Sequence, residues 1–182
     1  MDIVTIRHNA GLFSCCSVRL THILNYVNSN KKFPDVVDSS EQFDWYKKDS
    51  KKDITFEYFQ HYSNIYAEIH TPINHHWERQ FTNYSNIDHI GLKSLIKKYF
   101  SPSFEVDTII NNIQNKYKLD YENICVLFYR GNDKNRETTK CSYDDYLIYA
   151  NQIIQKNPNI QFLIQSDETE FIEFMTKTFP TN

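Results

Sequence analysis

The clearest hydrophobic pattern in the chain is a short apolar run that ends abruptly in a polar segment. Residues 124–129 (ICVLFY) are all apolar or aromatic, which predicts a strand buried on both faces. Residues 130–137 (RGNDKNRE) follow directly and combine three cations, two carboxylates and one of the chain's three glycines. In open α/β sheets, ligands bind beyond the carboxyl ends of the strands. The polar segment is therefore a candidate ligand-binding loop.

Helix and strand patterns alternate after this segment. Residues 142–145 have the form of a capping box, and the apolar stripe that follows predicts a helix through Ile154. A turn is predicted at 157–159, a further strand at 160–164, and a final helix capped by residues 167–170. The order strand, helix, strand, helix predicts a parallel sheet.

The N-terminal part of the sequence also predicts a strand followed by a turn and a helix. Residues 3–6 predict a strand and residues 7–11 a turn, and Ser14 or Ser17 is expected to cap a helix with an apolar stripe through Val27. The turn is either a plain connection or a phosphate-binding loop, since one glycine does not make the dinucleotide fingerprint. A short strand is expected near residues 31–38, and two helices between 90 and 117 separated by Ser101-Pro102.

Two other segments have features of binding sites. Residues 41–63 interleave aromatic residues with lysines, a pattern typical of single-stranded nucleic-acid binding, but nearby carboxylates cancel the charge and favour a core with a solvated face. Residues 69–78 contain three histidines in a proline-containing segment that lacks the spacing of a metal site. We interpret that segment as a surface loop or as one that lines an acceptor cleft, and we predict no metal site.

Composition narrows the classes of protein that remain. A chain of 182 residues can form one good core or two small lobes, and its net charge of -3 argues against a general nucleic-acid binder. No apolar run reaches the roughly 20 residues needed to span a bilayer, and no signal-peptide pattern opens the chain. The four cysteines have no C-x-x-C spacing, so we expect free thiols and a cytoplasmic location.

The arginine in the polar segment suggests the chemistry of its ligand. Two of the chain's five arginines, Arg130 and Arg136, lie there. A guanidinium binds phosphate through two parallel hydrogen bonds, so we predict a phosphorylated ligand. The alternative is that Arg130 pairs with Asp133 or Glu137 in an ordinary surface ion pair. Asp167, at the end of the next strand, could likewise be only a helix cap.

Several landmarks in this half of the chain resemble the α1,6-fucosyltransferase-like superfamily of GT-B glycosyltransferases, in which a strand is followed by Arg-Arg-Thr-Asp-Lys. The corresponding residues here are Arg130-Gly131-Asn132-Asp133-Lys134. Further landmarks are Glu137, Tyr146 within residues 143–147, the strand end QSDE at 165–168 in place of Thr-Asp-Asp, and the close of the last helix at 176–180.

The resemblance implies an enzyme that transfers fucose from GDP-fucose to a sugar hydroxyl, with inversion and without a metal or other cofactor. Its partners would be a nucleotide sugar and a glycan acceptor. By the resemblance, Arg130 would hold the diphosphate and stabilise the departing GDP, and Glu137 would be the general base. The other donor-binding residues would be Asp133, Lys134, Tyr146 and Asp167.

The resemblance also implies a GT-B-like α/β fold with Rossmann-like parallel sheets flanked by helices. We expect an acceptor-side lobe at residues 1–118 and the first half of a donor lobe at 119–182, because the family's last donor-site motifs would lie beyond residue 182. Gly131 also replaces the second arginine of the motif. The alternative function is therefore a non-catalytic truncated relative that binds nucleotide sugars or other proteins. A phosphate-handling enzyme of another α/β family is less favoured, since neither G-x-x-x-x-G-K-[ST] nor G-x-S-x-G occurs.

Overall fold

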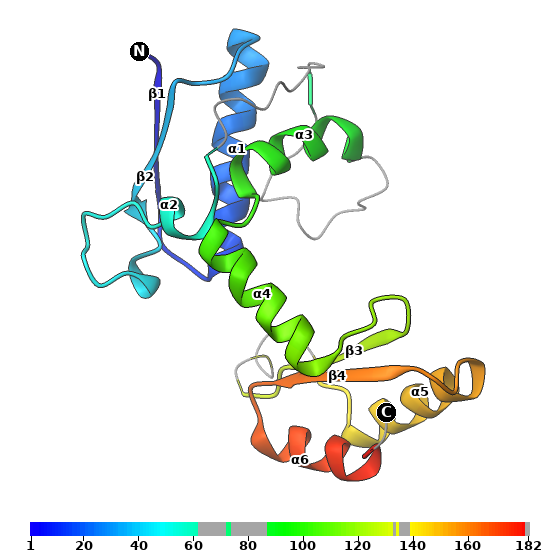
Figure 1. The fold of residues 1–182 in the computed structure, drawn as a ribbon. Coiled ribbons are helices and arrows are strands. Elements are labelled where there is room, and N and C mark those ends of the chain that lie inside the picture. The colour runs from blue at the N-terminus through cyan, green and yellow to red at the C-terminus, as the bar shows by residue number, and fades with distance from the viewer. Residues whose placement is uncertain (62–71, 74–86, 133, 135–138, 181–182) are drawn as a thin grey trace. The chain divides into compact units, whose positions relative to one another are not determined.

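The computed structural model describes residues 1–61, 72–73, 87–132, 134 and 139–180 (Figure 1). Within these residues the protein is mixed α/β, and its strands form two parallel two-stranded sheets, β1–β2 and β3–β4. The chain divides into two compact units, residues 1–112 and 113–182. The elements are β1 (Ile3–His8), α1 (Leu12–Asn30), β2 (Val36–Gln42), the 3-10 helix η1 (Asp44–Tyr46), α2 (Thr55–Tyr58), α3 (His89–Phe100), α4 (Phe104–Tyr117), β3 (Ile124–Tyr129), α5 (Tyr143–Lys156), β4 (Gln161–Ser166) and α6 (Thr169–Thr178).

The first unit is organised around α1, which connects the parallel strands β1 and β2. The strands pair from Ile3 with Val36 to His8 with Gln42, with one irregularity between Thr5 and Arg7. The core of this unit combines apolar residues of β1, α1, β2 and α3, and its buried members are Ile6, Val18, Leu20, Ile23, Leu24, Val27, Val37, Ile73, Leu92, Leu95 and Tyr99.

The predicted caps of α1 are wrong, because the helix begins at Leu12, before Ser14 and Ser17. Gly11 occupies the cap position without a side-chain bond, and the amide of Leu12 donates instead to the Tyr46 hydroxyl at 2.9 Å. A residue 34 positions away in sequence therefore satisfies one of the amides that a helix leaves unpaired at its start.

The second unit is a β-α-β-α arrangement, and the predicted parallel sheet is confirmed. β3 and β4 pair in register from Ile124 with Gln161 to Tyr129 with Ser166, with α5 as the crossover. Ser142 and Asp145 form the predicted capping box of α5. The buried core consists of Leu127, Tyr129, Ala150, Phe171, Met175 and Phe179.

The prediction that residues 124–129 are buried on both faces is wrong. Leu127 and Tyr129 are buried in the core with α5 and α6, whereas Val126 is 53% and Phe128 50% exposed. Successive side chains of a strand point to opposite faces, so the alternation means that the sheet buries one face only. The apolar run could not predict that only one face is buried, because the residues on both faces of the strand are apolar.

Three further features bear on the predictions. The predicted division at residues 118 and 119 lies just after α4, the helix that contains the boundary between the two compact units. None of the helices that the structure describes is long and apolar enough to cross a bilayer. All four cysteines are free thiols, and burial raises the pKa of Cys16 to about 11.

Candidate functional site

The candidate site lies at the carboxyl ends of β3 and β4. Because Tyr129 pairs in register with Ser166, the residues that follow these strands, Arg130 and Asp167, are neighbours. The amide of Gly131 donates to Oδ1 of Asp167 at 2.8 Å, and Nε of Arg130 lies 3.9 Å from Oδ2 of the same carboxylate. Asn132 also donates from its side chain to the Asp167 carbonyl. Asp167 therefore holds the beginning of the polar segment against β4.

Arg130 is positioned but not enclosed. Its side chain is 42% exposed, and that of Asp167 is 31% exposed. An ion pair with this much solvent contact contributes at most about 1 kcal/mol. The exposed part of the Arg130 side chain is therefore accessible to solvent. The alternative partners, Asp133 and Glu137, lie outside the described residues.

The predicted cap at residues 167–170 contains the cap residue of α6, but the alternative in which Asp167 is only that cap is wrong. The cap residue of α6 is Glu168, and no side chain makes a cap hydrogen bond there. The Asp167 carboxylate instead accepts a hydrogen bond from the Gly131 amide and forms an ion pair with Arg130. The parallel pairing explains this, because it places the end of β3 within reach of the residue after β4.

Glu168, one of the residues predicted to cap the last helix, also contacts the site, which the sequence did not indicate. Its Oε2 accepts a hydrogen bond from the Tyr143 hydroxyl at 2.6 Å, and its Oε1 lies 3.6 Å from Nζ of Lys140. The bond to Glu168, with burial and the negative charge of the same carboxylate, raises the pKa of Tyr143 to about 12. The sequence signal was its place beside Asp167 at a strand end.

Gly131 fits against that carboxylate. A Cβ atom at position 131 would lie 1.7 Å from Oε1 of Glu168, far inside contact distance. The position therefore excludes a side chain while Glu168 keeps its bonds to Tyr143 and Lys140. The carboxylate of Glu168 thus occupies the space beside the residue that replaces the family's second arginine.

Tyr146 supports the strand end from the core side. Its hydroxyl donates to the backbone carbonyl of Phe128 at 2.7 Å. Its ring packs edge-on against Tyr129 and Phe171, with centroid distances of 5.6 and 5.0 Å. Burial raises the pKa of Tyr146 above the ordinary value for tyrosine. This geometry makes Tyr146 a residue that positions β3.

Of the predicted set, the structure thus brings Arg130 and Asp167 together, and Tyr146 contacts the end of β3 that precedes Arg130. Lys134 is described and half-buried. Asp133 and Glu137 lie outside the described residues, as do the three histidines of residues 69–78. Among the residues that the structure describes, no group of three or more His, Cys, Asp or Glu side chains could hold a metal ion.

The N-terminal turn at residues 7–11 contacts β2 and η1. Arg7 pairs with Glu41 of β2 at 2.7 Å. The side-chain amide of Asn9 donates to the Asp44 carboxylate, and the backbone amide of Asp44 donates to Oδ1 of Asn9. These contacts are those of a connection that joins β1 to α1. They do not indicate a phosphate-binding loop.

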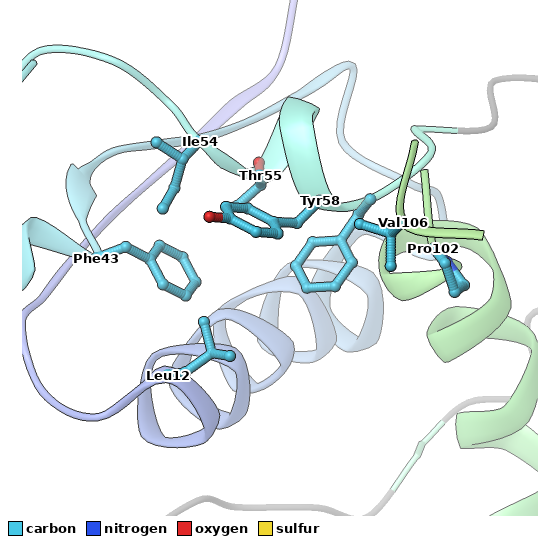
Figure 2. A pocket seen from close by; sticks show the side chains of 8 residues that line it. Leu12, Phe43, Ile54, Thr55, Tyr58, Pro102 and Val106 are labelled. Atoms are coloured by element: carbon cyan, nitrogen blue, oxygen red, sulfur yellow. The ribbon is translucent and has the colours of Figure 1, made fainter. Parts of the chain in front are cut away.

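A separate apolar pocket lies in the first unit, with a volume of about 210 Å³. Figure 2 shows its lining side chains converging from α1, α2, the loop at Phe43 and the beginning of α4. The lining residues are Leu12, Phe43, Ile54, Thr55, Tyr58, Phe59, Pro102 and Val106. None of them is charged, so this pocket is unsuited to a diphosphate.

Chemically, a guanidinium is a group that binds anions. The site presents the partly exposed guanidinium of Arg130 paired with the Asp167 carboxylate, and a second carboxylate, that of Glu168, lies beside Gly131 and pairs with Lys140. Comparison of the chain with protein-family models and with curated proteins finds no match.

Proposed function

We propose that the chain is a glycosyltransferase of the α1,6-fucosyltransferase-like type, which transfers fucose from GDP-fucose to a sugar hydroxyl with inversion and without a metal. One observation carries the proposal: a partly exposed guanidinium, that of Arg130, is held by Asp167 at the carboxyl ends of two parallel strands. Ligands of α/β sheets bind at this edge, and guanidinium groups bind diphosphates.

In the proposed reaction Arg130 contacts the diphosphate, where negative charge grows as GDP departs. A cation fixed before the reaction stabilises that charge without having to reorganise. Glu137 is the proposed general base, because a sugar hydroxyl is too weak an acid to attack without losing its proton. Asp133 and Lys134 complete the donor site, Asp167 orients Arg130, and Tyr146 fixes the strand end.

The proposal includes a GT-B-like architecture, with an acceptor-side lobe at residues 1–118 and part of a donor lobe at 119–182. The β-α-β-α order and parallel pairing of the second unit are compatible with part of a Rossmann-like donor lobe.

A nucleotide panel tests the proposal. GDP, UDP, CMP and ADP are added at millimolar concentration, and the unfolding temperature is measured for the wild type, Arg130→Ala and Arg7→Ala. Arg7 is a matched control, since it is also an exposed arginine paired with a carboxylate. A nucleotide at 100 times its dissociation constant stabilises the folded state by about 2.7 kcal/mol. We expect GDP to stabilise the wild type and Arg7→Ala but not Arg130→Ala. No GDP shift in the wild type would contradict the proposal.

The alternative is a non-catalytic relative that binds nucleotide sugars or another protein. One observation favours it: the carboxylate of Glu168, in place of a second guanidinium, lies beside residue 131. Glu137→Gln separates the two functions. If the wild type transfers fucose or hydrolyses GDP-fucose, and Glu137→Gln retains GDP binding but loses that activity, the protein is an enzyme. GDP binding without transfer or hydrolysis in the wild type identifies the binding module.

A further inference from the structure

The apolar pocket of the first unit has a buried wall and a partly exposed mouth. Phe43, Ile54 and Thr55 of its lining are buried, whereas Leu12 is 36% and Tyr58 42% exposed. Figure 2 shows the side chains of Phe43, Tyr58 and Leu12 pointing toward one another. The folded unit therefore already contains a cavity that is enclosed on one side and open on the other.

The interior of this pocket is apolar even though two of its lining residues carry hydroxyl groups. The Thr55 hydroxyl donates to Oδ1 of Asp53 at 2.6 Å, and only apolar atoms present their surface to the cavity. None of the lining residues is charged. A charged ligand would lose its hydration here without gaining a hydrogen bond, whereas an apolar ligand would leave water at no such cost. The pocket therefore selects against charge.

The backbone at Phe43 supports a ligand-binding role for the pocket. Phe43 has φ 62° and ψ 29°, a left-handed conformation that is rare for a bulky residue. The Asp44 amide donates to Oδ1 of Asn9 at 3.0 Å and the Tyr46 amide donates to the Phe43 carbonyl at 2.9 Å, and these bonds hold the turn. The result is a Phe43 side chain that is 1% exposed and forms part of the pocket wall. Unfavourable backbone conformations of this kind cluster at ligand-binding sites.

We propose that this pocket binds a small, uncharged aromatic molecule of one ring. A cavity of about 150 Å³ lined by Leu, Ile and Phe side chains is large enough to hold benzene. The volume here is about 210 Å³, which suits one ring with a short substituent. The rings of Phe43, Tyr58 and Phe59 provide faces and edges against which an aromatic ligand packs favourably. All lining residues belong to the first unit, so the site is distinct from Arg130 in the second.

The test follows the methyl resonances of the full chain by NMR while toluene is added, with sodium benzoate as a charged molecule of similar shape. We expect saturable shifts with toluene at Leu12, Ile54 and Val106, because the bound ring would lie beside their methyl groups. Benzoate should bind at least tenfold more weakly, because its carboxylate would have to leave water.

Variants that fill the cavity locate the binding site. Val106→Phe and Leu12→Phe each add a ring to the lining from a different helix, and each should weaken toluene binding at least tenfold. Ile109→Phe is the matched control, because Ile109 lies on the same helix as Val106 but is 56% exposed and outside the lining. It should bind toluene as the wild type does. Far-UV circular dichroism verifies that each variant is folded.

Four results would overturn the inference. One is the absence of a saturable toluene shift at the lining methyl groups. Another is wild-type toluene affinity in a folded cavity-filling variant. The third is benzoate binding as tightly as toluene, which would contradict an uncharged ligand. The fourth is an equal response at the exposed side chains of Val126 and Leu163, which would indicate unspecific adsorption. The titration contains no nucleotide, so its outcome is independent of the GDP experiment.

Discussion

Position 131 illustrates how single residues shape the candidate site. Gly131 does not adopt a positive φ, so its lack of a side chain is a matter of space. That space is taken by the carboxylate of Glu168, which Tyr143 and Lys140 hold in place. The choice of residue at position 131 therefore depends on a residue 37 positions later in the chain. This interaction was not visible in the motif.

Gly131→Ala should therefore displace the Glu168 carboxylate and break its bond to Tyr143. We expect the free energy of unfolding to fall by about 1 kcal/mol, the value of one hydrogen bond. Urea denaturation measures the change. In a Glu168→Ala background the same substitution should be neutral or slightly stabilising, because the clash is gone and alanine restricts the unfolded chain. An equal loss in both backgrounds would contradict the contact.

The Tyr143–Glu168 bond also makes a prediction about alkaline pH. The pKa of Tyr143 is raised to about 12 in the folded state, against about 10 for an unfolded tyrosine. The neutral hydroxyl therefore contributes stability that is fully present below pH 10 and is lost as the pH rises from about 10 to 12. Tyrosine ¹³C NMR measures the titration. Glu168→Gln should lower the Tyr143 pKa toward 10, and a wild-type pKa near 10 would contradict the bond.

At the scale of elements, local signals were predictable and contacts between elements were not. The capping box of α5 lies within four consecutive residues, 142–145, and it forms as predicted. The start of α1 depends on the Tyr46 hydroxyl, and the exposure of Val126 and Phe128 depends on which face of the sheet the helices cover. Neither the start of α1 nor the exposed face of β3 could be predicted from the residues next to it in the sequence.

The capping box gives a prediction for α5. Ser142 accepts from the amide of Asp145, and the Asp145 carboxylate accepts from the amide of Ser142. Ser142→Ala should lower the free energy of unfolding by about 1 kcal/mol. Asp145→Ala in the Ser142→Ala background should cost less than Asp145→Ala alone, because the two bonds form one motif. Additive losses in chemical denaturation would contradict a reciprocal cap.

At the scale of the whole molecule, the class of fold followed from the order of patterns. Alternating strands and helices predicted parallel pairing, and both sheets of the described chain are parallel. The pairing then placed Arg130 beside Asp167, although they are 37 residues apart in the sequence. The sheet topology predicts that Arg130 and Asp167 are neighbours. It does not predict that the Asp167 carboxylate accepts a hydrogen bond from the Gly131 amide.

The buried polar cluster around Arg19 was missed, although the sequence contained a signal. Arg19 lies three residues after Cys16 and four before Ile23, so it falls on the apolar stripe of its own helix. A charged residue on that stripe predicts either a gap in the packing or a buried polar cluster. Its hydrogen-bond partner is Ser39 of β2, which in turn donates to Gln42, and no local pattern connects these residues to α1.

The central claim is that Arg130 binds the diphosphate of a nucleotide at the end of β3. Isothermal titration of GDP into the wild type, Arg130→Ala and Arg7→Ala tests it most directly. A hydrogen bond to a charged group contributes about 1.5–3 kcal/mol, which corresponds to a factor of roughly 10 to 100 in the dissociation constant. We predict that Arg130→Ala binds GDP that much more weakly while Arg7→Ala binds as the wild type does. Equal affinities of Arg130→Ala and the wild type would contradict the account.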